Sequence, residues 1–410
     1  MGARGNLADF RILDLTTEAG FLTGKLLGDL GADVIKVEPP TGHPARRRGP
    51  FAGGAEDGEG SVLWMALNTS KRGVTLDLES ARGRALFLDL CTKADAVLES
   101  SGPGWLESLE LGWDVLHARN QRLVLCRISP FGLDGPRATW RGSDLTAVAT
   151  GGNMYPTGNP ERAPVRCSLP VAYYHGGIEA AAGVTFALWG RESSGRGQVV
   201  DVSLQETMVM PNMTTPAQYP LTGFKGGRIG GGFRGGAARF RELWPCKDGY
   251  VSFALRGGPA RLAGIVALVA YMDENGMAPA AVKNRDWKSY NHNLVSQAEV
   301  DEIEAALAAF FASKTMRELY EAACERKLML APAYTARQIG ASRQLASREF
   351  FVDVEVPGRA QPVLFPGPFA RSNLGGIEIR RRAPRLGEHN AEVYGELGVD
   401  AGTLRREGVI

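Results

Sequence analysis

Short apolar runs alternate with helical spacing through the first third of the chain. Phe10–Leu15 has the length expected for a buried strand, and Phe21–Leu30 then repeats leucine at helical spacing up to Gly31. The alternation continues, so we predict strands at 34–37, 73–78, 96–98 and 123–128, and helices at 80–93 and 113–118. This pattern indicates a doubly wound α/β domain, in which ligands bind outside the carboxyl ends of the strands.

The composition changes after Glu206. Residues 207–240 are rich in Gly, Pro and Thr and are interpreted as a linker. Residues 241–330 contain a short β pair around Leu243–Leu255 and then helices, which predicts a smaller α+β domain. We therefore expect residues 1–206 to form the first part of a large domain and residues 331–410 to form a return linker and its C-terminal part.

Charge and cysteine content argue against several kinds of partner and against a metal site. Lys and Arg total 47 against 45 Asp and Glu, a net charge of +2, so neither nucleic acid nor a membrane surface is an expected partner. The five cysteines are scattered without metal-ligand spacing, which predicts no metal site and a reducing, cytoplasmic location. The apolar stretch Ala180–Trp189 is too short to cross a bilayer and is predicted to be a buried helix. No dinucleotide fingerprint follows the first strand.

Eight motifs occur in an order that resembles the family III CoA-transferases, also called the carnitine dehydratase/bile-acid-inducible type. The motifs are Arg11–Leu15, Leu27–Pro40, Leu67–Arg72, Val74–Leu78, Lys93–Glu99 with Leu111-Gly112, Ser129–Pro136, Gly195–Ser203 and Pro384–His389. The resemblance implies a Rossmann-like large domain that binds CoA, a smaller α+β domain, and a chain that forms a ring interlocked with a second subunit. It also implies CoA as part of the substrate, with no permanently bound cofactor.

The resemblance places the family's catalytic aspartate at Tyr173. Family members use that carboxylate to attack a thioester, but the matching segment here is Leu169-Pro-Val-Ala-Tyr173-Tyr174-His175. A phenol with a pKa of about 10 is largely protonated near neutrality and would form an aryl ester in place of an anhydride. His175 is a candidate acid or base, or else a packed residue near a helix start. Glu179 or Glu206 would have to supply a carboxylate from elsewhere.

The expected CoA contacts are partly retained. Lys71 and Arg72 match a basic pair near the nucleotide phosphates, or else lie in a surface loop. Ser100 and Pro103 lie where the family often has Asn-Phe-Arg-Pro-Gly, so an arginine is missing. Asp144 follows Gly142-Ser143, where the racemase branch has Gly-His-Asp.

Three hypotheses follow. The first is a subunit of a heteromeric CoA-transferase, in which a homologous partner carries the aspartate, as the resemblance to paired enzymes of aromatic degradation such as the benzylsuccinate CoA-transferases implies. Its substrates would be an acyl-CoA such as succinyl-CoA and an aromatic or dicarboxylic acid. The second is a stand-alone acyl-CoA isomerase or lyase that uses His175, and the third is a non-enzymatic scaffold.

Overall fold

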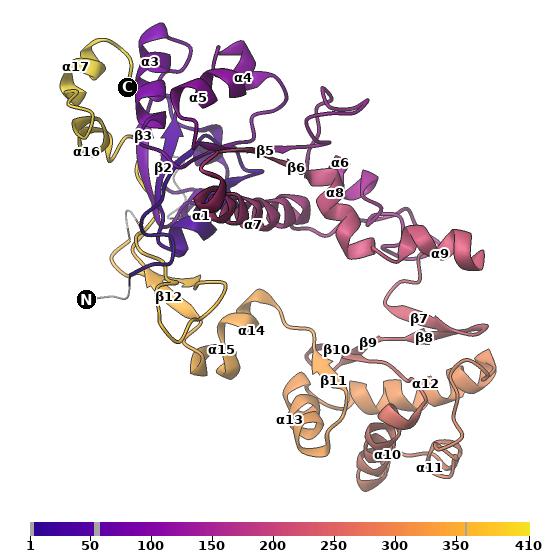
Figure 1. Cartoon of the computed structure of the whole chain (residues 1–410). Coiled ribbons are helices and arrows are strands. Elements are labelled where there is room, and N and C mark those ends of the chain that lie inside the picture. The colour runs from indigo at the N-terminus through magenta and orange to yellow at the C-terminus, as the bar shows by residue number, and fades with distance from the viewer. Residues whose placement is uncertain (1–3, 53–57, 357–358) are drawn as a thin grey trace. The chain divides into compact units, whose positions relative to one another are not determined.

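The chain divides into two compact units in a computed structural model that describes residues 4–52, 58–356 and 359–410 (Figure 1). The larger unit comprises residues 1–153, 166–222 and 346–410, and the smaller unit comprises residues 154–165 and 223–345. Each unit is therefore built from segments that are distant in sequence.

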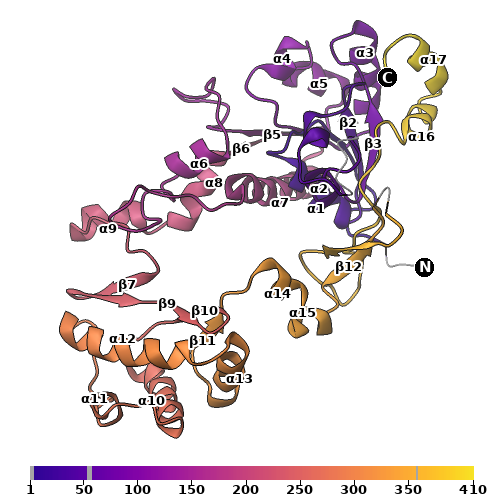
Figure 2. The ribbon, with the colours of Figure 1, turned by 180° about the vertical axis from the view of Figure 1, so that it is seen from behind.

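A six-stranded parallel sheet in the order β3-β2-β1-β4-β5-β6 forms the centre of the larger unit. Its strands β2, β3, β5 and β6 are labelled in Figures 1 and 2. Its strands are β1 (Arg11–Asp14), β2 (Asp33–Glu38), β3 (Lys71–Thr75), β4 (Ala96–Glu99), β5 (Val124–Ser129) and β6 (Val199–Ser203). Its main helices are α1 (Phe21–Asp29), α2 (Val62–Leu67), α3 (Ala81–Cys91), α4 (Trp105–Ser108), α5 (Trp113–Arg119), α6 (Asp144–Thr150), α7 (Val171–Ser194), α8 (Leu204–Val209), α9 (Thr215–Thr222), α16 (Asn390–Gly395) and α17 (Ala401–Arg406). The predicted α/β architecture with a parallel sheet is confirmed.

The two faces of this sheet are covered by different helices. On one face, Leu13, Ile35 and Leu125 pack with Leu86 and with residues of the C-terminal helices, including Tyr394 and Leu404. On the other face, α1 lies against α7, and α7 lies against β5 and β6. The last residues of the chain thus complete a core that the first residues begin.

One strand begins earlier than predicted. We expected a strand at 73–78, but β3 starts at Lys71, which pairs in parallel register with Val34 of β2. The prediction left Lys71 and Arg72 out of the strand because charged residues rarely lie in a buried strand unless they have ion partners, which the sequence does not show.

Helix α7 is a helix as predicted, but it is not buried throughout. Gly176, Ala180 and Val184 pack inward, whereas the side chains of Phe186 and Trp189 are 69% and 77% exposed. The prediction of a buried helix was wrong for this side because composition does not reveal whether anything covers an apolar face.

The smaller unit joins a three-stranded antiparallel sheet to helices. The sheet contains β9 (Leu243–Cys246), β10 (Gly249–Phe253) and β11 (Leu330–Pro332), and β7 (Gly232–Gly235) and β8 (Ala238–Arg241) form a separate hairpin. Its helices are α10 (Pro259–Glu274), α11 (Ala280–Lys283), α12 (Gln297–Ala312), α13 (Met316–Arg326) and α14 (Ala336–Gly340). Trp244 and Phe311 meet in its core, where their ring centroids are 5.5 Å apart.

Candidate functional site

The order of the strands reverses between β1 and β4, which places a crevice at their carboxyl ends. Two loops leave the sheet there, one after β1 and one after β4. The Thr17 N–H donates to Ser100 Oγ at 2.8 Å, and the Thr17 and Ser100 hydroxyls are 3.0 Å apart. Ser100, a predicted CoA contact, therefore ties the two loops together, and Pro103 is half-buried in the second loop.

A cavity of about 190 Å³ opens at this edge of the sheet. Residues from the ends of β1, β2, β3 and β4 line it: Leu15, Thr17, Val37, Glu38, Pro39, His43, Leu76, Asp77, Leu78, Glu79, Ser101 and Trp105. These lining residues were not among the site residues predicted from the sequence. Their one sequence signal was the expectation that ligands bind beyond the strand ends, and the individual residues are brought together only by the sheet order.

His43 forms one wall of this cavity as a neutral imidazole. Its Nδ1 accepts from the Ala45 N–H at 3.0 Å, and its ring stacks against Trp64. Burial lowers the pKa of His43 to about 3, and the nearby Lys36 ammonium adds to this effect. The ring is thus held as an uncharged hydrogen-bond acceptor.

A buried ion cluster lies behind the loop after β1. Lys71 Nζ lies 2.8 Å from Asp14 Oδ2 and also donates to the Phe21 carbonyl at 2.8 Å and to Asn68 Oδ1 at 2.9 Å. Lys36 Nζ lies 3.2 Å from the other oxygen of Asp14. Burial alone would raise the pKa of Asp14, but the two ammonium groups hold it well below its usual range. Two cations share one carboxylate, so the cluster carries an excess positive charge.

Gly24 on α1 makes this close approach possible. A Cβ atom at that position would lie 2.3 Å from Asp14 Oδ2 and 2.9 Å from Lys71 Cε. Any side chain there would push the helix away from the ion pair. The sequence Leu22-Thr-Gly-Lys25 thus supports the buried charges that the strands contribute.

The two predicted phosphate ligands are engaged within the chain. The three contacts of Lys71 account for its ammonium hydrogens, and the side chain has no exposed surface. Arg72 binds Asp33 at 2.6 and 2.9 Å and also binds Glu392 and Glu396 at 2.8 and 2.9 Å. Their contact with CoA stays a prediction, and the role that the structure displays for both is to hold charged elements together.

Tyr173 lies at the start of α7, beside the first turn of α6. Asp144 Oδ1 accepts from the Ala172 N–H at 2.9 Å, and its other oxygen lies 3.6 Å from Arg166. Burial raises the pKa of Tyr173, and the carboxylates of Asp144 and Glu18 act in the same direction. This phenol is therefore even less prone to ionise than a free tyrosine.

The other candidate carboxylates and the histidine occupy different settings. His175 is exposed on α7 and Glu179 is half-buried one turn later, where burial raises the pKa of Glu179 and His175 opposes that rise. Glu206 is exposed in the first turn of α8. Glu18, which the sequence analysis missed, forms an ion pair with Arg48 and lies close enough to affect the pKa of Tyr173.

Within residues 4–52, 58–356 and 359–410, no three His, Cys, Asp or Glu side chains gather as a metal site would require. In the same ranges, every helix is too short or too polar to span a bilayer.

Comparison with known proteins adds independent information. The family model described as CoA-transferase family III matches residues 7–390. The chain is 34% identical over 394 residues to succinyl-CoA:(R)-benzylsuccinate CoA-transferase subunit BbsE of Thauera aromatica, covering 96% of this chain and 94% of that protein. It is 31% identical to succinyl-CoA–D-citramalate CoA-transferase of Chloroflexus aurantiacus, covering 95% and 94%. The crystal structure of a CAIB/BAIF family protein from Brucella suis superposes with a TM-score of 0.81 at 27% identity, covering 96% and 100%.

Proposed function

The chain belongs to CoA-transferase family III, and on that premise we propose that it is one subunit of a heteromeric CoA-transferase whose catalytic aspartate comes from a homologous partner. The reaction would move CoA from an acyl-CoA such as succinyl-CoA to a carboxylic acid, of which benzylsuccinate is the first to test. Tyr173 at the start of α7 is the observation that carries the proposal.

The environment of Tyr173 supports a loss of nucleophilic function. Transfer through a mixed anhydride requires a carboxylate that attacks the thioester carbonyl while CoA leaves as a thiolate. Burial raises the pKa of the Tyr173 phenol, and the Asp144 carboxylate acts in the same direction. A protonated phenol is a wall of the proposed site, and an ester on it would be a poor carrier for the acyl group.

The exposed face of α7 supports a partner subunit. Ile178, Phe186 and Trp189 leave large apolar surfaces uncovered on the same long helix that begins at Tyr173. Apolar surface of this kind is stabilised when another chain covers it. The proposed partner is a homologue that interlocks with this chain. Its aspartate would be the nucleophile that attacks the thioester.

The cavity at the strand ends is the proposed contact with CoA. Its apolar walls, including Leu76 and Trp105, suit a planar heterocycle. Coenzyme A is then a substrate, and the chain needs no resident cofactor.

Co-expression tests the proposal. The chain is purified alone and together with a homologue that retains the aspartate, and each preparation is assayed for succinyl-CoA-dependent transfer to benzylsuccinate. We expect activity and co-purification only for the pair. Conversion of an acyl-CoA by the chain alone without an acceptor acid would favour an isomerase or lyase that uses His175, and absence of CoA binding would favour a scaffold.

A second candidate is a self-sufficient transferase in which Glu18 supplies the carboxylate. Glu18, the ion partner of Arg48, lies close enough to raise the pKa of Tyr173, and this favours the alternative. The chain alone would then transfer CoA, and Glu18→Gln would abolish transfer while Glu179→Gln would not. Inactivity of the unmodified chain alone eliminates this candidate.

A further inference from the structure

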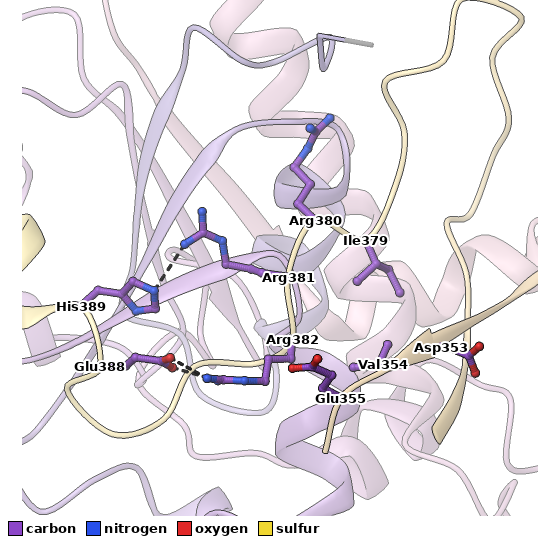
Figure 3. Close-up of a pocket in the computed structure, with 9 residues that line it drawn as sticks. All are labelled: Asp353, Val354, Glu355, Ile379, Arg380, Arg381, Arg382, Glu388 and His389. Atoms are coloured by element: carbon purple, nitrogen blue, oxygen red, sulfur yellow. Dashed lines mark hydrogen bonds and ion pairs between the residues drawn. The ribbon is translucent and has the colours of Figure 1, made fainter. Parts of the chain in front are cut away.

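A second cavity, of about 520 Å³, lies in the C-terminal part of the larger unit (Figure 3). It shares no lining residue with the cavity at the strand ends. Its walls come from the end of β12 (Phe351–Val354) and from the segment that leads to α16: Asp353, Val354, Glu355, Ile379, Arg380, Arg381, Arg382, Glu388 and His389. None of these residues was used in the function proposed above.

The imidazole of His389 is fixed in one tautomer. Its Nδ1 accepts from the Gly73 N–H at 3.1 Å, while the His389 backbone N–H donates to the Gly73 carbonyl at 2.9 Å. A neutral imidazole whose Nδ1 accepts a hydrogen bond carries its proton on Nε2. The outward nitrogen of His389 is therefore a donor.

Arg381 presents a second donor to the same point. Its Nη1 lies 3.4 Å from His389 Nε2, and a guanidinium has donors only (Figure 3). Two donors that face each other cannot bond to one another. Each needs an acceptor oxygen, and one oxyanion placed between them would satisfy both.

The charge of Arg381 is left uncompensated at this place. Arg380 pairs with Glu378 at 3.3 Å, and Arg382 pairs with Glu388 at 2.6 Å. Among the residues that the structure describes, no carboxylate lies within ion-pair distance of Arg381. The neighbouring arginines are neutralised locally, so the positive charge available to a ligand belongs to Arg381.

The backbone holds this donor pair in position. The Arg381 carbonyl accepts from the Ser70 N–H at 2.9 Å, and the Arg380 N–H donates to Ser70 Oγ at 3.1 Å. His389 is hydrogen-bonded to Gly73, which follows Ser70 by three residues. The backbone of Arg381 and the ring of His389 are therefore both held by β3 and the turn before it, which lowers the entropy cost of ordering the two donors around a ligand.

We propose that this cavity binds the phosphate group of a small ligand, held between Arg381 and His389. A guanidinium matches the geometry of phosphate oxygens, and Nε2–H adds a donor from a second direction. Asp353 and Glu355 line the other part of the cavity and disfavour a second anionic group there. They suit hydroxyl or amino groups, so a ligand with one phosphate at one end fits better than a dicarboxylate.

Calorimetric titration with inorganic phosphate tests the site, with Arg381→Gln compared with Arg337→Gln, an equal loss of charge at an exposed position on α14. We expect Arg381→Gln to weaken phosphate binding by roughly tenfold or more, the effect of losing a charge-assisted hydrogen bond. Arg337→Gln should leave the affinity unchanged. Arg381→Lys keeps the charge but loses the paired guanidinium donors, so its phosphate affinity should lie between those of the other two variants.

Three outcomes would overturn the proposal: equal phosphate affinity in Arg381→Gln and the unmodified chain, no phosphate binding at millimolar concentration, or tighter binding of succinate than of phosphate. Titration with CoA identifies the source of the phosphate. If Arg381→Gln weakens CoA binding in parallel, the phosphate of CoA occupies the site; if CoA affinity is unchanged, a separate phosphorylated ligand does. Because phosphate binding needs no transfer activity, failure of this site and failure of the proposed transferase are distinguishable.

Discussion

Replacing Lys71 by Met separates a structural role from a ligand-binding role. The substitution keeps most of the buried side-chain volume but removes an ammonium that contacts Asp14, the Phe21 carbonyl and Asn68. Removing one partner of a buried pair typically costs about 3–5 kcal/mol because a charge is left uncompensated. Asp14 still has Lys36 at 3.2 Å in this variant. We therefore expect the free energy of unfolding to fall by an amount at the lower end of that range, about 3 kcal/mol.

Urea denaturation followed by far-UV circular dichroism and tryptophan fluorescence measures this loss. Trp64 is a suitable reporter because it is buried and packs edge-to-face on Phe21, whose carbonyl accepts from Lys71. The matched control is Lys283→Met, which removes an exposed pair with Asp273 at 2.7 Å. A surface pair of this kind contributes about 0–1 kcal/mol, so the control should unfold close to the unmodified chain.

Stability and CoA affinity together distinguish the two roles of Lys71. If Lys71→Met unfolds like the Lys283→Met control while its affinity for CoA collapses, then Lys71 is a phosphate ligand and the buried pair contributes little to stability. If the free energy of unfolding falls and the folded variant still binds CoA, Lys71 acts as a buried structural charge.

Further predictions concern the site and its titratable groups. Tyr173→Asp should give the chain alone measurable succinyl-CoA-dependent transfer, since a carboxylate near a helix start is stabilised there; continued inactivity would show that more than the nucleophile is missing. Trp105→Ala should raise the Kd for CoA about tenfold by calorimetry without changing the fold, and unchanged affinity would exclude this cavity as the CoA contact. The pKa of His43 is about 3 when folded and 6.5 ordinarily, so stability present above pH 6.5 is lost as the pH falls toward 3; His43→Asn, which keeps an acceptor for Ala45, should flatten that loss in urea titrations at several pH values. The Arg382 guanidinium lowers the pKa of Glu388 from 4.5 to about 2, so the stability from this pair is lost between those values, and Glu388→Gln should remove that acid-dependent step.

Periodicity predicted the elements of the sheet better than it predicted the site. The segments Phe10–Leu15 and 96–98 became β1 and β4, and the helices predicted at 80–93 and 113–118 became α3 and α5. These elements follow from local spacing, which the sequence displays directly. The cavity beside Trp105 depends on the order of strands in space, which no local pattern encodes.

The candidate site residues also depend on contacts in space that the sequence does not show. A sequence shows charge but neither burial nor ion partners, so it could not reveal that Lys71 is buried or that the carboxylates binding Arg72 include two from the distant C-terminus. Glu18 was missed because its nearness to Tyr173 arises from the approach of α7 to the loop after β1. Tyr173, by contrast, was selected from the sequence alone because the residues around it match the family segment, and its place in the site stays a prediction.

The packing of α16 and α17 against the first strands has a consequence for biosynthesis. Tyr394 donates to the Thr75 carbonyl at 2.6 Å, and Leu404 lies in the same core as Leu13. A nascent chain on the ribosome cannot close this core until α16 and α17 have emerged, so the apolar surface of the strands stays open long after those strands have been made. Production of this protein should therefore depend on chaperones that shield unfinished sheets, and stop codons placed before Asn390 should yield aggregated chains instead of shorter soluble ones.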